Sequence, residues 1–290
     1  MINQFWKENN IRFRRENRKS VLVQLVYLWF IRLFLQVTKR LKGIKKPIVH
    51  LYAVCWNEEK MLPFMLNYYS EFVSQFYIYD NYSDDNTDEI LKKWENVTVR
   101  KYDTGGALND VIHNTIKNNA WKKSRGKADW IIAIDMDEFL YSPNLKEHLT
   151  CATKEGASIF QTQGYDMYAE KYPIYSPTKK ITDMVKTGML SDYYSKSIIF
   201  NPNRIVEMNY MPGAHESFPE GIVKFAKEKL SLLHYKNLGL PLLLERQDRY
   251  RKRLSNENKE KIYGMQYARE DELIIEEFEK NMKCVIQIIM

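Results

Sequence analysis

Three carboxylates follow a short apolar run in the middle of the chain. Residues 130–134 read WIIAI, and Asp135, Met136, Asp137 and Glu138 come directly after them. Side chains two residues apart on extended chain leave the same side, so Asp135 and Asp137 are expected to point into one place. Like charges that close repel unless a cation joins them. Hard oxygen ligands select Mg²⁺ or Mn²⁺, so the spacing predicts a divalent-cation site.

A plainer interpretation of these acids stays open. They could cap the segment that follows or pair with surface lysines. Acids also end two other segments that have the pattern of strands, however: Asp80 ends QFYIYD at residues 75–80, and Asp103 ends VTVRKYD at residues 97–103. This repetition favours a shared functional rim.

The elements that must position these acids alternate along the chain. Alternation of strand and helix predicts a Rossmann-like α/β fold, a mostly parallel sheet with helices on both faces. Ligands bind such sheets at the carboxyl ends of the strands, which is where the acids gather. The predicted strands are 48–54, 75–80, 97–103 and 130–134, and the predicted helices are 58–72, 87–94 and 107–123.

Three motifs in this order resemble the opening of glycosyltransferase family 2 and its GT-A relatives. The motifs are NEE at 57–59, IYDNYSDDNTDEI at 78–90 and WIIAIDMDEF at 130–139. The resemblance is closest to the subset that also resembles glycosyltransferase family 92, and it is strongest over residues 48–142. It implies the GT-A fold and transfer of a sugar from a nucleotide donor.

The resemblance also implies roles for individual residues. Asp80 would contact the nucleotide base, with Asn57 and Glu58 shaping the base pocket. Asp135 would contact the ribose or the metal, and Asp137 would hold the Mn²⁺ or Mg²⁺ that bridges the donor diphosphate. A divalent cation is suited to this task because it stabilises the charge that develops on the leaving diphosphate.

The second half of the chain supplies further candidates. The HY pair at 234 and 235 resembles an element of family 92-like sequences, which makes His234 a candidate third metal ligand; a core or capping histidine is the alternative. Lys196 is a candidate for binding the diphosphate. Arg246, Arg249 and Arg253 share one helical face, for which a solvent-facing charged stripe is the default interpretation.

An inverting transfer needs a general base that takes the proton of the acceptor hydroxyl. Glu216, His215 and Asp166 are the acids and bases in the loops where that group is expected. The sequence does not separate them, so all three stay candidates.

The net charge is concentrated at the N-terminus. Residues 1–47 carry 12 Lys and Arg against two Glu, whereas the rest of the chain carries 32 basic and 35 acidic side chains. A nucleic-acid protein would spread basic charge over its folded domain, so no nucleic-acid partner is expected.

Residues 21–37 are apolar apart from Gln24, Arg32 and Gln36, which share one helical stripe. This pattern favours a helix lying on an anionic membrane surface. A true membrane span and a helix packed on its own domain are the alternatives.

These observations lead to one expected organisation and function. Residues 1–47 form a basic, membrane-associating amphipathic helix, residues 48–255 the GT-A domain, and residues 256–290 a helical extension. The expected activity is inverting, Mn²⁺- or Mg²⁺-dependent transfer from a UDP-sugar to a lipid-linked or cell-surface polysaccharide acceptor, at the cytoplasmic face of the membrane. The rivals are a haloacid-dehalogenase-type phosphohydrolase, which also carries DxD after an apolar strand, and a non-catalytic membrane scaffold.

Overall fold

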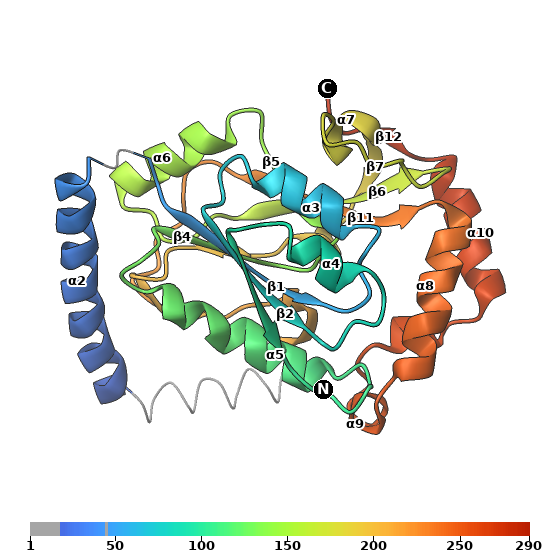
Figure 1. Ribbon diagram of the computed structural model, residues 1–290, viewed down its shortest axis with the longest axis horizontal. Coiled ribbons are helices and arrows are strands. Elements are labelled where there is room, and N and C mark those ends of the chain that lie inside the picture. Colours follow the sequence, from blue (N-terminus) through green and yellow to red (C-terminus); the bar gives the residue numbers. More distant parts are fainter. Residues whose placement is uncertain (1–17, 44–45) are drawn as a thin grey trace.

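The computed structural model describes residues 18–43 and 46–290 (Figure 1). The basic residues of segment 1–17 therefore lie outside the described part. The first sheet has the strand order β3-β2-β1-β4-β8, and its first four strands run parallel while β8 pairs antiparallel with β4. Its strands are β1 Val49–Cys55, β2 Gln75–Asp80, β3 Val97–Lys101, β4 Trp130–Ile134 and β8 Ile199–Phe200. The predicted parallel α/β arrangement is confirmed.

Both faces of this sheet are covered because successive strand residues point to opposite sides. On β1, Leu51 and Ala53 join the apolar cluster that contains helix α3 (Leu62–Tyr69). Tyr52 between them joins a second cluster, which contains Trp121 and Ile131. The strand is therefore buried on both sides, as its mostly apolar sequence indicates.

The predicted helices are present but shorter than expected. Helix α3 begins after residues 58–61, which form a turn, and Pro63 occupies its first turn, where the missing N–H costs nothing. Helix α5 (Asp110–Asn119) is capped by Asn109, whose Oδ1 accepts from two backbone N–H groups, and a 3₁₀ segment continues it to Ser124. Helix α4 covers Thr87–Leu91.

A second five-stranded sheet has the order β12-β7-β6-β11-β5. Strand β11 pairs parallel with β6 and antiparallel with β5, and this register places His234 opposite both Asp166 and Glu138. Because β5 starts only three residues after β4 ends, Asp135 and Asp137 lie at the junction of the two sheets. The strands are β5 Glu138–Tyr141, β6 Thr162–Ala169, β7 Thr187–Leu190, β11 Leu230–Leu238 and β12 Ile286–Gln287.

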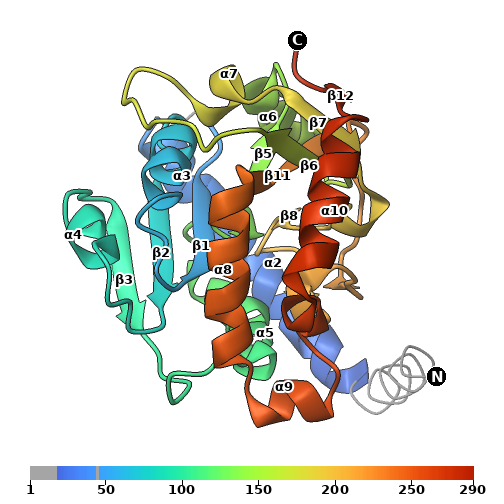
Figure 2. The same ribbon diagram turned by 90° about the vertical axis from the view of Figure 1, so that its right-hand side faces the viewer.

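The C-terminal segment packs against the domain. Helix α10 (Asp271–Met282) runs beside α8 (Leu240–Arg253) in both views, and its Ile274 and Phe278 form a cluster with Tyr168 and Leu243 (Figures 1 and 2). Strand β12 then joins the edge of the second sheet. The boundary expected at residue 255 stays a prediction. The remaining elements are α6 Leu145–Glu155, α7 Ile181–Met184, α9 Asn256–Glu260, β9 Ile205–Glu207 and β10 Glu220–Gly221.

Helix α2 (Arg18–Leu41) lies at the end of the molecule opposite α8 and α10 (Figure 1). Leu28 and Leu35 are buried against the domain, and Lys39 Nζ lies 2.6 Å from Asp129 Oδ2. One face of the helix therefore packs on its own domain, as one of the three interpretations of this segment expects. By length and composition alone, Val21–Leu41 would also suffice to cross a membrane.

Candidate functional site

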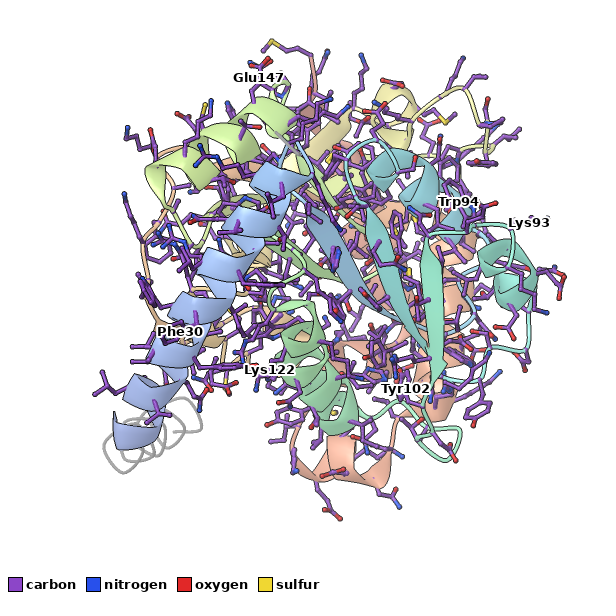
Figure 3. The ribbon with its side chains drawn as sticks, turned by 60° about the vertical axis from the view of Figure 1, so that its left-hand side comes forward. Phe30, Lys93, Trp94, Tyr102, Lys122 and Glu147 are labelled. Carbon is purple, nitrogen blue, oxygen red and sulfur yellow. The ribbon has the colours of Figure 1, made fainter. Side chains whose placement is uncertain are left out.

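A cleft opens where the carboxyl ends of β1, β2 and β4 meet helices α5 and α8. Strand ends supply acids and aromatic rings to it, and the helices supply cations. Tyr102, just after β3, is one of these rings (Figure 3). The lining includes Trp56, Glu58, Asn81, Tyr102, Lys117, Asp135, Asp137, Tyr194, Lys196, His215, His234, Arg246, Tyr250 and Arg253.

Asp135 is held by two lysines from distant segments. Its Oδ1 lies 2.7 Å from Lys117 Nζ on α5, and its Oδ2 lies 3.9 Å from Lys196 Nζ. Burial acts to raise the pKa of Asp135, but the two ammonium groups outweigh it and hold the pKa at about 2. The carboxylate is therefore ionised at neutral pH.

Asp137 is held by an arginine and a histidine. Arg246 Nη1 on α8 donates to its Oδ2 at 2.7 Å, and His234 Nε2 lies 3.5 Å from the same oxygen. The other ring nitrogen of His234 lies 2.9 Å from Asp166 Oδ1. Burial acts to lower the pKa of His234, but the two flanking carboxylates raise it to about 9. His234 is therefore an imidazolium between two acids.

Lys196 lies between the carboxylates of Asp135 and Glu138. Its ammonium lies 2.5 Å from Glu138 Oε1, and Glu138 Oε2 in turn accepts from the backbone N–H of Asp135 at 3.0 Å. Both carboxylate oxygens of Glu138 therefore have partners, and they help to position Lys196 and the backbone of Asp135. Lys196, predicted to bind the nucleotide sugar, lines the cleft.

The default interpretation of the arginine stripe is wrong. Arg246 contacts Asp137, and Arg253 donates to Asn81 Oδ1 at 2.6 Å with its guanidinium 3.3 Å from the centre of the Trp56 ring. Arg249 donates to the backbone carbonyl of Asn57. The spacing of the three arginines predicted that they share one helical face. It did not predict that this face packs over the strand ends, because only the tertiary fold brings α8 to them.

The residues expected at the nucleotide base occupy different environments. Asp80 is fully buried, accepts from Ser83 and pairs with Lys101, and it is not among the cleft-lining residues. Asn57 donates to Asp84 Oδ1 at 2.5 Å, outside the main cleft. Glu58 lines the cleft, and burial raises its pKa to about 7. The base-contact roles stay predictions.

The three candidate bases are also separated by the fold. His215 lines the cleft. Asp166 is joined to His234, and Glu216 is exposed and lies outside the cleft lining. Sequence reasoning alone gave no means of distinguishing them.

The donor set at the cleft suits a hard divalent cation in part. Asp135 and Asp137 supply the one or two carboxylates that Mn²⁺ or Mg²⁺ takes when substrate phosphates fill the other positions. Among the described residues, no three His, Cys, Asp or Glu side chains are grouped so that they could hold a metal ion. His234 would have to lose its proton before it could serve as a ligand, because a metal binds the neutral imidazole.

Several cleft residues had no signal in the sequence. Lys117 is the single lysine of the polar helix α5, and nothing in its spacing marks it as a site residue. Trp56 follows β1 without a recognisable motif, and Tyr194 ends a short 3₁₀ segment. Lys117 and Tyr194 reach the cleft because helix α5 packs on β1 and the segment of Tyr194 packs on β6.

Several solved structures are similar to parts of this chain. The solved structures that resemble this chain include S. aureus TarS 1–349 in complex with UDP-GlcNAc, at 12% identity and a TM-score of 0.40 over 71% of this chain. They also include the same fragment in complex with UDP, at 11% identity and a TM-score of 0.41 over 71% of this chain. A further TarS structure matches 53% of this chain at 15% identity and a TM-score of 0.35.

This chain spans 65 to 66% of the TarS fragments and 28% of the other TarS chain. No curated protein matches it.

The sequence pattern of glycosyltransferase family 92 matches residues 50–286, well beyond residue 142, where the motif resemblance thins. The match decides against the phosphohydrolase alternative, because it includes both the acid-rich strand ends and the second sheet. Because the match covers most of the chain, the chain belongs to glycosyltransferase family 92.

Proposed function

We propose that this glycosyltransferase is metal-dependent and inverting, and that its donor is a nucleotide sugar, with a UDP-sugar the first choice. The observation that carries the proposal is the pair of carboxylates formed by the buried Asp137 and the partly exposed Asp135, which Lys117, Lys196 and Arg246 surround. A mixed cluster of carboxylates and cations at strand ends is suited to a diphosphate, which needs both a bound cation and direct positive partners.

The cations of the cleft have a direct role in this proposal. Lys117, Lys196 and Arg246 would donate to the diphosphate oxygens and stabilise the charge that grows there as the sugar leaves. Mn²⁺ or Mg²⁺ held by Asp135 and Asp137, with His234 as a candidate third ligand, would supply Lewis-acid stabilisation of the same leaving group.

The nucleotide would extend toward α8. Trp56 and Arg253 form a stacked pair there, and Asn81 accepts from Arg253 at the end of β2. A planar ring and a guanidinium side by side suit a nucleobase, which is both flat and rich in hydrogen-bond acceptors. Glu58 lies at the same end of the cleft, 3.5 Å from the Tyr250 hydroxyl.

The acceptor proposal rests on α2. The side of this helix that faces outward is its apolar one, including Val26, Phe30 and Phe34, whereas Arg32 and Lys39 lie on the partly buried side. A helix packed on a domain in water would place these faces the other way round. The exposed apolar side chains of α2, which we call the outer ridge, are therefore suited to docking into an anionic membrane surface at the cytoplasmic face. A position at that surface supports a lipid-linked or polysaccharide acceptor.

The donor site can be tested by thermal stability with UDP, GDP and CDP, each with and without Mn²⁺, on the wild type, Asp137→Asn and Asp248→Asn. A metal-dependent rise for one nucleotide is expected in the wild type and in the Asp248→Asn control, which changes an exposed acid of α8. The Asp137→Asn protein is expected to lose that rise. The same rise with and without Mn²⁺ would overturn the metal dependence.

The membrane proposal needs variants that keep α2 docked. Phe30→Glu/Phe34→Glu changes only exposed side chains of the ridge, and Leu28, Leu35 and Lys39 remain to hold the helix. Flotation with vesicles containing anionic lipid is expected for the wild type and is expected to be lost in the double variant. Resistance of the wild type to alkaline extraction would instead indicate a membrane span.

A further inference from the structure

We propose that His215 is the base that takes the proton of the acceptor hydroxyl, a proposal that rests on the transfer reaction set out above. His215 lies after the short 3₁₀ segment Pro212–Ala214 and lines the cleft that Asp135 and Asp137 also line. Its two ring nitrogens have different surroundings, and that difference defines which of them can accept a proton.

Nδ1 of His215 lies 2.8 Å from the backbone carbonyl oxygen of Tyr193. A carbonyl only accepts hydrogen bonds, so Nδ1 must carry a hydrogen. Burial first and the nearby Lys196 ammonium second lower the pKa of His215 to about 3, so the ring is neutral and holds a single hydrogen. Nε2 therefore carries a free lone pair.

The edge of the His215 ring that carries Nε2 lies against Gly213. A Cβ added to Gly213 would come within 2.7 Å of His215 Nε2 and 2.5 Å of its Cδ2, so the ring rests against the glycine backbone. Gly213 has φ +75°, a conformation that side chains rarely adopt. The Tyr193 ring also stacks on the imidazole, with centroids 3.8 Å apart. The loop is thus shaped to hold this ring at the cleft.

The other acids and bases of the cleft differ from His215 in their contacts or their position. Asp166 is hydrogen-bonded to His234, and Glu216 does not line the cleft. His113 lines the cleft, but its Nε2 is buried without access to solvent. Glu58 lies beside Tyr250 and Arg246, on the side assigned above to the nucleotide. Of these groups, His215 combines a free lone pair with a place on the open cleft.

The proton transfer balances as follows. The acceptor O–H gives its proton to His215 Nε2, and the oxygen forms a bond to the anomeric carbon of the donor sugar. The bond from that carbon to the β-phosphate oxygen breaks, and its electron pair leaves with the nucleoside diphosphate. His215 becomes an imidazolium with hydrogen on both nitrogens, and Tyr193 O continues to accept from Nδ1.

Donor binding is expected to strengthen this base. Lys196 weakens the basicity of His215 by its positive charge. A diphosphate bound beside Lys196 brings compensating negative charge, so His215 gains basicity when the donor is present. Proton removal from the acceptor is thereby coupled to occupancy of the donor site.

The activity test uses His215→Asn, Gly213→Ala, Glu58→Gln and the control His148→Asn in the full chain. Asn can still donate to Tyr193 O but cannot act as a base, and Gly213→Ala keeps the imidazole while displacing it. His148 lies on α6, outside the cleft. The readouts are UDP affinity and release of UDP from a panel of UDP-sugars, with water as the acceptor.

We expect UDP release to fall roughly 100-fold in His215→Asn and by a smaller factor in Gly213→Ala, with UDP affinity unchanged within about two-fold. Unchanged release in His215→Asn, or a loss confined to Glu58→Gln, overturns the assignment of the base while leaving the proposed function standing. Absence of UDP, GDP and CDP binding to the wild type overturns the proposed function and this proposal with it.

A second measurement does not depend on turnover. Long-range ¹H–¹⁵N spectra of the histidine rings report which nitrogen carries hydrogen, and His215→Asn assigns the signal. We expect a protonated Nδ1 and an unprotonated Nε2 at neutral pH. The opposite tautomer, or a doubly protonated ring, overturns the proposal.

Discussion

The acids that follow β2 and those that follow β4 look alike in sequence but differ in their partners. Asp80 is paired with Lys101, which belongs to the neighbouring strand and lies 21 residues away. Asp137 is paired with Arg246, which lies 109 residues away on α8. Both carboxylates are almost fully buried, with exposed fractions of 0% and 2%. Burial alone therefore does not distinguish a structural acid from a site acid.

The difference lies in what the partners face. The Asp80 carboxylate also accepts hydrogen bonds from Ser83, three residues further along the chain. The hydrogen-bond partners of Asp80 therefore come from nearby residues. Asp135 and Asp137 are instead neutralised by cations from α5, α8 and the segment before β8, all of which line one cleft. Cations brought together from separate elements around a cavity mark the place where an anionic ligand is expected.

The largest expected effect is on catalysis at the β4 rim. Replacing Asp137 by Asn keeps the volume but removes the charge that holds Arg246 and His234 in place. We expect donor turnover to fall roughly 100- to 1000-fold, measured as nucleotide release. Circular dichroism checks that the variant is folded, and Asp248→Asn serves as the matched acid control. Turnover within a few-fold of the wild type would remove Asp137 from the site.

The next effect is on stability at the β2 rim. Asp80→Asn breaks the ion pair between the buried Asp80 carboxylate and the partly exposed Lys101, and it is expected to lower the free energy of unfolding by about 1.5 to 3 kcal/mol, measured by urea denaturation. Nucleotide affinity of the folded variant distinguishes the two roles of Asp80. An unchanged affinity would make Asp80 structural only, whereas a loss for one nucleotide would support the base contact that the family resemblance implies.

A smaller effect tests the pairing itself. Lys101→Met should also destabilise the protein, because it leaves the buried Asp80 carboxylate without its cation. The double variant Asp80→Asn/Lys101→Met is expected to be roughly 1 to 2 kcal/mol more stable than the sum of the single effects predicts. Strict additivity in the same denaturation experiment would show that the two groups do not interact.

The smallest expected effect concerns Glu58, at the end of β1. Burial raises its pKa from 4.5 to about 7, so between these values the folded state keeps a proton that the unfolded chain releases. The contribution of Glu58 to stability is therefore present below about pH 4.5 and is lost as the pH rises through about 7. Compared with Glu58→Gln, the wild type is expected to lose roughly 1 to 3 kcal/mol more between pH 5 and pH 8, measured by denaturation at each pH. Parallel pH profiles would contradict the raised pKa.

Much of the first sheet could be predicted from the sequence. The bounds of β2 and β4 agree with the predicted strands, because a buried parallel strand needs an unbroken apolar run and Asp80 and Asp135 end those runs. Helix ends were less certain because the first turns of α3 and α5 depend on Pro63 and Asn109. The second sheet was not predicted, since β11 joins β5 and β6 across about 70 to 90 residues and no local pattern reports such pairing.

The same limit applies to the cleft. That Asp135 and Asp137 share a place was predicted, although the chain turns between them and does not continue as one extended strand. Lys117, Arg246 and Arg253 were not assigned to them, because a cation on a helix reads as solvent-exposed until the packing of that helix is known. The orientation of α2 was also beyond the sequence, which shows a polar stripe but not which way it faces.

By itself, the sequence determined which residues can form the strands, where acids end them and that an apolar, basic helix precedes the domain. These properties follow from local periodicity and side-chain chemistry. The tertiary structure alone decided which acids are satisfied by neighbours and which meet distant cations, and which nitrogen of His215 is free. Such distinctions depend on contacts between residues far apart in the chain, where the strength of an electrostatic or hydrogen-bonding partner depends on a few ångströms of separation.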